Sequence, residues 1–121
     1  MPEARERVTG IGGVFFRARD PEALAAWYRE HLGVPVSGDG YVVFPESRDT
    51  HWVPFEQETD YWPRAKELMV NFTVRDLDAL LRQLRAAGVP VDDRVEEMEF
   101  GRFGWCADPE GNRVELWQPA G

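Results

Sequence analysis

The sequence of 121 residues has a single cysteine and no long hydrophobic run. Cys106 can therefore form no internal disulfide, which agrees with a reducing cytoplasm, and we expect it to be a buried bystander. No apolar stretch approaches the roughly 20 residues of a membrane span, and the charged residues 1–7 precede no apolar signal core. We expect a soluble, cytoplasmic protein without a membrane partner.

Basic residues are also scarce. Lysine and arginine number 14 against 22 aspartates and glutamates, which gives a formal net charge of -8. Proteins bind a phosphate backbone through clustered basic residues, so this balance argues against nucleic acid as a partner. A cationic or neutral small molecule fits better, although an acidic surplus also serves solubility alone.

Signatures of several catalytic classes are missing. The chain has no Gly-x-Ser-x-Gly elbow, P-loop, dinucleotide glycine fingerprint or Cys-x-x-Cys pair. The glycines of residues 10–13 precede a strand, whereas a cofactor loop precedes a helix. Nucleophilic catalysis therefore has little support.

What the chain does contain is an internal repeat with a period near half its length. Residues 14–20, Val-Phe-Phe-Arg-Ala-Arg-Asp, return as residues 70–76, Val-Asn-Phe-Thr-Val-Arg-Asp. The Gly-Val-Pro-Val of residues 33–36 returns at residues 88–91. The two copies predict a paired module within one domain, because 121 residues are too few for two independent domains.

Each copy carries the signals of a β-α-β-β-β module. In the first, a strand leads to a helix that Asp20 caps, Pro21 begins and Gly33 ends. In the second, Asp76 caps a helix with a leucine stripe that Gly88 ends. Strands are expected at residues 8–18, 41–44 and 51–55 of the first copy, and at residues 70–74, 96–100, 103–106 and 114–117 of the second.

We predict one α+β domain with a first module (8–57), a linker (58–66) and a second module (67–119). A lone module leaves one face of its sheet uncovered, so the two can pair curved mixed sheets around a central hollow with the helices outside. A hollow between repeats is a usual place for a small-molecule pocket. The sequence leaves open whether the modules pair within one chain or are swapped between chains.

With its elements placed in this way, the chain resembles the vicinal oxygen chelate superfamily, which includes glyoxalases, ring-cleaving dioxygenases, fosfomycin-resistance enzymes and bleomycin-binding proteins. The similarity covers residues 8–119. Its most specific parts are residues 12–33 and the closing Asp-Pro-Glu-Gly-Asn-Arg-Val-Glu-Leu-Trp of residues 108–117. The resemblance implies the paired-module fold and a homodimer, but it selects no single reaction.

Metal-using members of such a family carry ligands on the first and last strands of each half. Overlaying the two copies, the resemblance points to Gly13, His51, Met69 and Glu115. Glycine has no side chain and a thioether prefers soft metals, so His51 and Glu115 remain. Catalytic metal sites usually supply three protein ligands, so His51 and Glu115 are one ligand short. Glu56 is a possible third ligand only if the strand register turns its side chain to the same face as His51. We expect no cofactor, with a divalent metal at His51 and Glu115 as the alternative.

Glu115 lies between Val114 and Leu116, so alternation directs its side chain either into the hollow or to solvent. The resemblance favours the hollow, where the carboxylate could be a metal ligand, a general base or an anchor for a cationic group. A purely structural role stays open. Planar or hydrophobic ligands suit aromatic walls, and the residues expected to bind the ligand are Trp52, Tyr61, Trp105 and Glu115.

Two functions follow from these residues. The first is a metal-free binding protein that holds a small cationic or aromatic molecule, as bleomycin-binding members do. The second is an enzyme of the glyoxalase or dioxygenase type, in which an ion held by His51 and Glu115 chelates two substrate oxygens. A metal-independent enzyme with Glu115 as general base is a further alternative. We favour the first, because two of the four family positions have no usable ligand.

Overall fold

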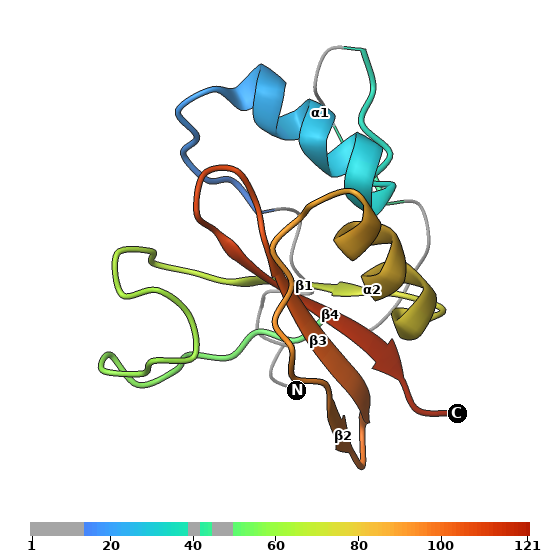
Figure 1. Cartoon of the computed structure of the whole chain (residues 1–121). Coiled ribbons are helices and arrows are strands. Elements are labelled where there is room, and N and C mark those ends of the chain that lie inside the picture. Colours follow the sequence, from blue (N-terminus) through green and yellow to red (C-terminus); the bar gives the residue numbers. More distant parts are fainter. Residues whose placement is uncertain (1–13, 39–41, 45–49) are drawn as a thin grey trace, which may run out of the picture.

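The computed structural model describes residues 14–38, 42–44 and 50–121 (Figure 1). Two helices and four strands occur within these residues. In chain order they are α1 (Pro21–Leu32), β1 (Val70–Thr73), α2 (Leu77–Ala86), β2 (Glu96–Met98), β3 (Gly101–Ala107) and β4 (Arg113–Pro119).

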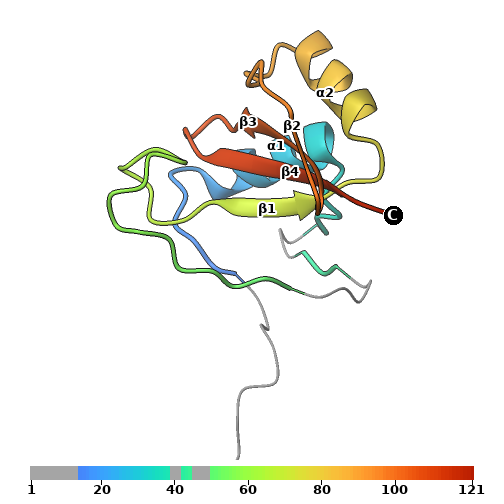
Figure 2. The same cartoon turned by 90° about the horizontal axis from the view of Figure 1, so that it is seen from below.

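The strands form a curved mixed sheet in the order β1-β4-β3-β2 (Figure 2). β1 runs parallel to β4, and β3 pairs antiparallel with both β4 and β2. A parallel neighbour requires a crossover connection, and α2 lies within that connection between β1 and β4. The sheet does not close on itself, so β1 and β2 are its edges.

Both helices begin as the repeat predicts. The carboxylates of Asp20 and Asp76 each accept a hydrogen bond of 3.1 Å from the backbone N–H three residues later. Pro21 occupies the start of α1, and Gly33 ends it with φ of 66°, a left-handed conformation that glycine adopts without strain. In the described part of the chain, no helix has the length and apolar content to cross a bilayer.

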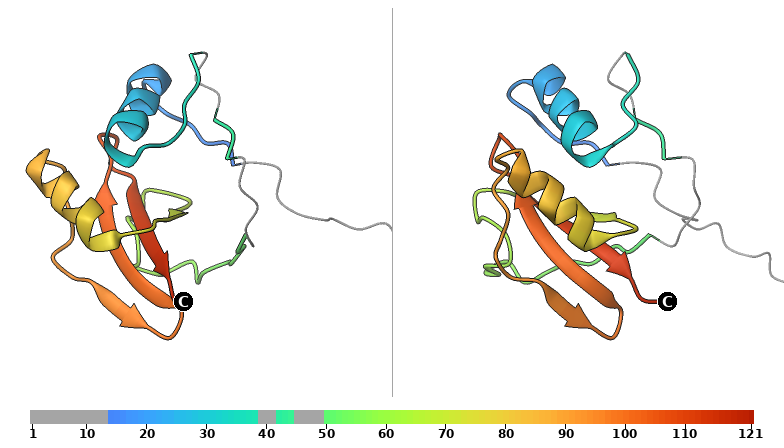
Figure 3. Two further views of the ribbon diagram at one scale, coloured as in Figure 1. Left: turned by 90° about the vertical axis from the view of Figure 1, so that its right-hand side faces the viewer. Right: turned by 45° about the vertical axis from the view of Figure 1, so that its right-hand side comes forward.

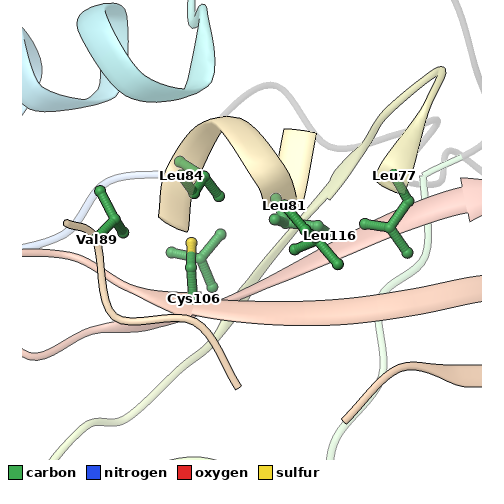
Figure 4. Close-up of a cluster of buried hydrophobic side chains, with 7 residues drawn as sticks. Leu77, Leu81, Leu84, Val89, Cys106 and Leu116 are labelled. Atoms are coloured by element: carbon green, nitrogen blue, oxygen red, sulfur yellow. The ribbon is translucent and has the colours of Figure 1, made fainter. Parts of the chain in front are cut away.

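The core lies between α2 and the strands β3 and β4 (Figure 4). Leu77, Leu81 and Leu84 recur at helical spacing and pack onto Cys106 and Leu116. α1 lies beside α2 (Figure 3), and its partly buried side chains pack against the same core. One face of the sheet is thus covered by α2, and the other is left for the functional residues.

Cys106 is the buried bystander that the sequence predicts. It is 3% exposed, and burial raises the pKa of its thiol to about 12. Because the thiolate is the reactive form, we expect the native protein to resist an aromatic disulfide reagent at neutral pH and the unfolded protein to react at once. The two labelling rates measure this, and rapid stoichiometric labelling of the native protein would contradict it.

The first half departs from the predicted module. Its helix is confirmed. In the described residues of this half, the only β pairing is an isolated bridge between Val36 and Val42, and none of the four strands lies there. No strand is present at residues 14–18 and 50–55, and the side chains of Phe15 and Trp52 in these segments are 89% and 77% exposed. No ladder forms in the described parts of the strands expected at 8–18, 41–44 and 51–55. The second half confirms the β-α-β-β-β order, and the α+β class is confirmed.

The turn between β3 and β4 is hydrogen-bonded to the first half of the chain. The Asp108 carboxylate accepts four hydrogen bonds: from the backbone N–H of Glu110 at 2.8 Å, from the backbone N–H and side chain of Asn112 at 2.9 and 2.7 Å, and from the Tyr28 hydroxyl at 2.7 Å. Burial and the bond to Asp108 raise the pKa of Tyr28, so its hydroxyl stays a donor. Because Tyr28 lies on α1, this bond joins α1 to the β3–β4 hairpin.

Glu110 makes a second link to the same helix. Its carboxylate accepts hydrogen bonds from the backbone N–H groups of Arg19 at 2.7 Å and Asp20 at 3.0 Å. The positive end of the α1 dipole also favours a negative charge there. The bonds from Asp20 and Arg19 hold the pKa of Glu110 below its ordinary value of 4.5.

Acid should therefore weaken the fold partly through Glu110. A carboxyl whose pKa is lower in the folded state stabilises the protein above its unfolded pKa, and that contribution is lost as the pH falls through the folded pKa. We expect urea unfolding to show a decline in stability below pH about 4.5 that Glu110→Gln reduces. Glu99→Gln, at an exposed position, should leave the decline unchanged. Coincident pH profiles for Glu110→Gln and the original protein would refute the assignment.

Candidate functional site

Glu115 points from β4 away from the core. Val114 and Leu116 pack in the core below α2, so alternation places Glu115 on the opposite side of the sheet. We call this side the open face; its residues are Asn71, Phe103, Trp105, Glu115 and Trp117. Glu115 is nevertheless only 8% exposed.

Three donors from three segments surround the carboxylate. Glu115 Oε1 accepts a hydrogen bond from Asn71 Nδ2 at 2.8 Å, and Oε2 accepts one from Trp105 Nε1 at 3.0 Å and another from the Tyr61 hydroxyl. The strand register brings Asn71 on β1 and Trp105 on β3 directly beside Glu115. These four residues are the Glu115 cluster. No cationic side chain of residues 14–38, 42–44 and 50–121 forms an ion pair with it.

Tyr61 reaches the cluster from the segment predicted to be a linker. Burial and then the bond to Glu115 raise the pKa of Tyr61, so its hydroxyl is protonated and donates. Its ring stacks on Phe55, with 5.7 Å between centroids, and meets the edge of Trp105 at 6.0 Å. The segment thus lies on the open face, across the sheet from α2 (Figure 2).

A cleft of about 950 Å³ opens beside the Glu115 cluster. Segments 60–64 and 90–96 form its sides, and Trp105 and Arg113 line it between them. The Arg113 guanidinium donates to Asp92 Oδ2 at 3.1 Å. The Arg94 backbone N–H and then the Arg113 side chain hold the pKa of Asp92 below its ordinary range. We call this the arginine cleft.

The fold agrees with comparison to known proteins. The family model described as a glyoxalase-like domain matches residues 13–117. The chain belongs to the glyoxalase-like domain family. Its predicted membership of the vicinal oxygen chelate superfamily is confirmed.

Several solved structures share the fold of this glyoxalase-like domain. A glyoxylase/bleomycin resistance protein/dioxygenase domain from Frankia sp. EAN1pec is 20% identical, with 94% of this chain and 100% of that chain covered and a TM-score of 0.63. TnmS3, an antibiotic-binding protein from Streptomyces sp. CB03234, is 23% identical, with 96% and 100% covered and a TM-score of 0.66. Oxidase ChaP-H2 is 21% identical, with 85% and 87% covered and a TM-score of 0.57. No curated protein matches the chain.

The glyoxalase-like domain brings three of the four predicted ligand-binding residues together. Tyr61, Trp105 and Glu115 are hydrogen-bonded in one cluster. Trp52 is not part of it, because its side chain is 77% exposed and makes no ring contact with the described aromatic residues. The role of these residues in binding stays a prediction.

The predicted metal ligands are less well assembled. The centroid of the His51 ring lies 5.6 Å from that of the Trp117 ring. Trp117 follows Glu115 by two residues on β4, so the two side chains lie on the same face of the strand. Met69 directly precedes β1, and Gly13 lies outside the described residues. In the described part of the domain, no three His, Cys, Asp or Glu side chains gather as a metal would require. His51 and Glu115 alone are fewer than the three protein ligands that a catalytic metal site usually supplies.

Asn71, Arg94 and Arg113 are site residues that were not predicted from the sequence. A signal for Asn71 exists, because an amide inside a strand between Val70 and Phe72 breaks an apolar run and needs a partner. The sequence contains no comparable signal for Arg94 and Arg113. Their convergence depends on which residues face each other across the sheet.

Proposed function

We propose that this glyoxalase-like domain binds a small aromatic molecule on its open face, with a cationic or donor group of the ligand directed at Glu115. The observation that carries this proposal is a buried carboxylate held by neutral donors alone. A ligand cation that replaces the Tyr61 hydroxyl gains a charge-assisted hydrogen bond in a site with little water. The Glu115 cluster then acts as the anchor of the site.

The rings of the open face support an aromatic ligand. Phe103 and Trp117 stack with their planes 1° apart and 5.9 Å between centroids. Phe55 and Tyr61 add a second stacked pair. Flat apolar surfaces with a few placed polar groups are typical of small-molecule sites. TnmS3, which shares the fold, is an antibiotic-binding protein, and that likeness is an analogy of fold.

Isothermal titration with matched probes tests the proposal. We expect 1-naphthylmethylammonium to bind the original protein about tenfold more tightly than Glu115→Gln does, because the substitution removes the charge that pairs with the ammonium group. The neutral 1-naphthylmethanol should show a much smaller difference. Glu99→Gln, at an exposed position, is the matched control. Equal ammonium affinities for the original protein and Glu115→Gln would reject the anchor role.

We further propose that binding requires no metal, because no three possible metal ligands gather in the described part of the chain. The second candidate is the metal-dependent enzyme, which the placement of His51 against Trp117 favours. Elemental analysis of protein purified without chelators separates the two. We expect no stoichiometric metal and no rise in melting temperature with zinc, manganese, nickel or iron. A stabilising metal whose effect disappears in His51→Ala would favour the enzyme.

A homodimer in the cytoplasm completes the proposal. Apolar side chains exposed in the first half support an interface, since such patches mark protein contacts. They include Val14, Phe15, Phe16, Val43 and Phe44. A reducing compartment also suits the single free thiol of Cys106. Size-exclusion chromatography with light scattering should give twice the mass of one chain, and a monomer at micromolar concentration would count against the dimer.

A further inference from the structure

Two arginines converge on one tryptophan ring in the arginine cleft. The guanidinium carbons of Arg94 and Arg113 lie 5.2 and 5.1 Å from the centroid of the Trp105 ring. The ring attracts each cation through its π face but carries no net charge to neutralise either. Each guanidinium therefore still gains from an anion beside it.

Each of the two arginines has one carboxylate partner in the cleft, and neither partner uses all of the arginine's donors. One Asp92 oxygen accepts from Arg113 Nη2 at 3.1 Å, and the other accepts from the backbone N–H of Arg94 at 2.9 Å. Glu96 lies 3.5 Å from Arg94 Nη1, farther than the about 2.7–2.9 Å of a strong charge-assisted bond. In the described part of the chain, the buried Nε of Arg113 has no acceptor.

Arg94 owes its position to a bulge. Val91 pairs with Cys106 and Glu96 pairs with Phe103, so the four residues 92–95 stand opposite the two residues 104–105. Bulges redirect side chains, and they are common beside functional sites. Here the guanidinium of Arg94 lies over Trp105 at the wall of the cleft rather than along the sheet edge.

We propose that the arginine cleft binds a carboxylate of the ligand between Arg94 and Arg113, with the aromatic part of the ligand against Tyr61 and Trp62. The planar fork of a guanidinium matches the geometry of a carboxylate and can bind it through two parallel hydrogen bonds. At about 950 Å³ the cleft has ample room for an aromatic acid. The ligand of the proposed function thus carries a carboxylate in addition to the cationic or donor group directed at Glu115, although the chain as a whole is acidic.

This inference rests on the proposed function only in placing an aromatic ligand on the open face. Isothermal titration with 1-naphthoate and 1-naphthamide, which differ in charge but hardly in shape, tests it. We expect naphthoate to bind the original protein about tenfold more tightly than naphthamide, and Arg94→Gln to abolish that preference. Arg94→Lys keeps the positive charge but lacks the planar guanidinium, so this variant should retain part of the preference for naphthoate. Arg82→Gln, exposed on α2 on the far side of the sheet, should change nothing.

Two results would overturn the carboxylate site. One is that naphthoate binds the original protein no more tightly than naphthamide does, or shows no binding at millimolar concentration. The other is an unchanged naphthoate affinity in Arg94→Gln, whose exposed position makes misfolding of that variant a poor explanation. If the ammonium probe depends on Glu115 while naphthoate shows no preference, only this inference fails. If naphthoate depends on Arg94 while Glu115→Gln changes nothing, only the anchor role fails.

Discussion

Asp108→Ala should lower the free energy of unfolding by about 3–4 kcal/mol, which is a large effect for one polar side chain. The Asp108 carboxylate is 5% exposed and accepts four hydrogen bonds. Removing it leaves those donors without their partner, and a buried unpaired donor is costly. Urea unfolding followed by tryptophan fluorescence measures the change.

Smaller substitutions separate the two roles of Asp108. Tyr28→Phe removes only the bond to α1 and should cost about 1 kcal/mol. Hydrogen exchange should accelerate in α1 in both variants, but the β3–β4 turn should loosen only in Asp108→Ala. Asp93→Asn, at an exposed position, is the control. If the free energy of unfolding of Asp108→Ala lies within about 0.5 kcal/mol of that of the original protein, the hydrogen bonds of Asp108 do not stabilise the fold.

Local features of the fold could be predicted from the sequence because they depend on residues close in the chain. A capping carboxylate acts on a backbone N–H three residues later, so Asp20 and Asp76 marked both helix starts. The leucine stripe of α2 likewise fixed the buried side of that helix. The strands of the first half were not predictable in this way, because a strand needs a partner that its own sequence does not identify.

The candidate site was predictable only at its centre. Alternation limited Glu115 to two faces, and the structure places it opposite the core. Its donors Asn71 and Tyr61 lie 44 and 54 residues away along the chain. Arg94 depends on a bulge whose two extra residues shift the register. A pattern with a period of two residues cannot reveal such an insertion, so the arginine cleft emerged only from the fold.

Replacing Glu115 with leucine should destabilise the protein by about 3 kcal/mol, although leucine is apolar and similar in size. The substitution leaves Asn71, Tyr61 and Trp105 without their shared acceptor. Glu115→Gln keeps one acceptor oxygen and should cost about 1–2 kcal/mol. Urea unfolding at neutral pH measures both. Were Glu115→Leu as stable as the original protein, the polar cluster would contribute nothing to the fold.

A double-mutant cycle between Glu115→Gln and Tyr61→Phe decides how the cluster works. Tyr61 lies in the segment over the open face and shares Glu115 Oε2 with Trp105. A coupling energy of about 1 kcal/mol or more would mean that the hydrogen bond between Tyr61 and Glu115 keeps the Tyr61 segment packed on the open face. A ligand cation that takes the same oxygen must then displace Tyr61. Tyr61→Phe should therefore lower stability yet bind 1-naphthylmethylammonium more tightly, because the protein's own donor no longer competes. A purely structural Glu115 would give the loss of stability without the gain in affinity.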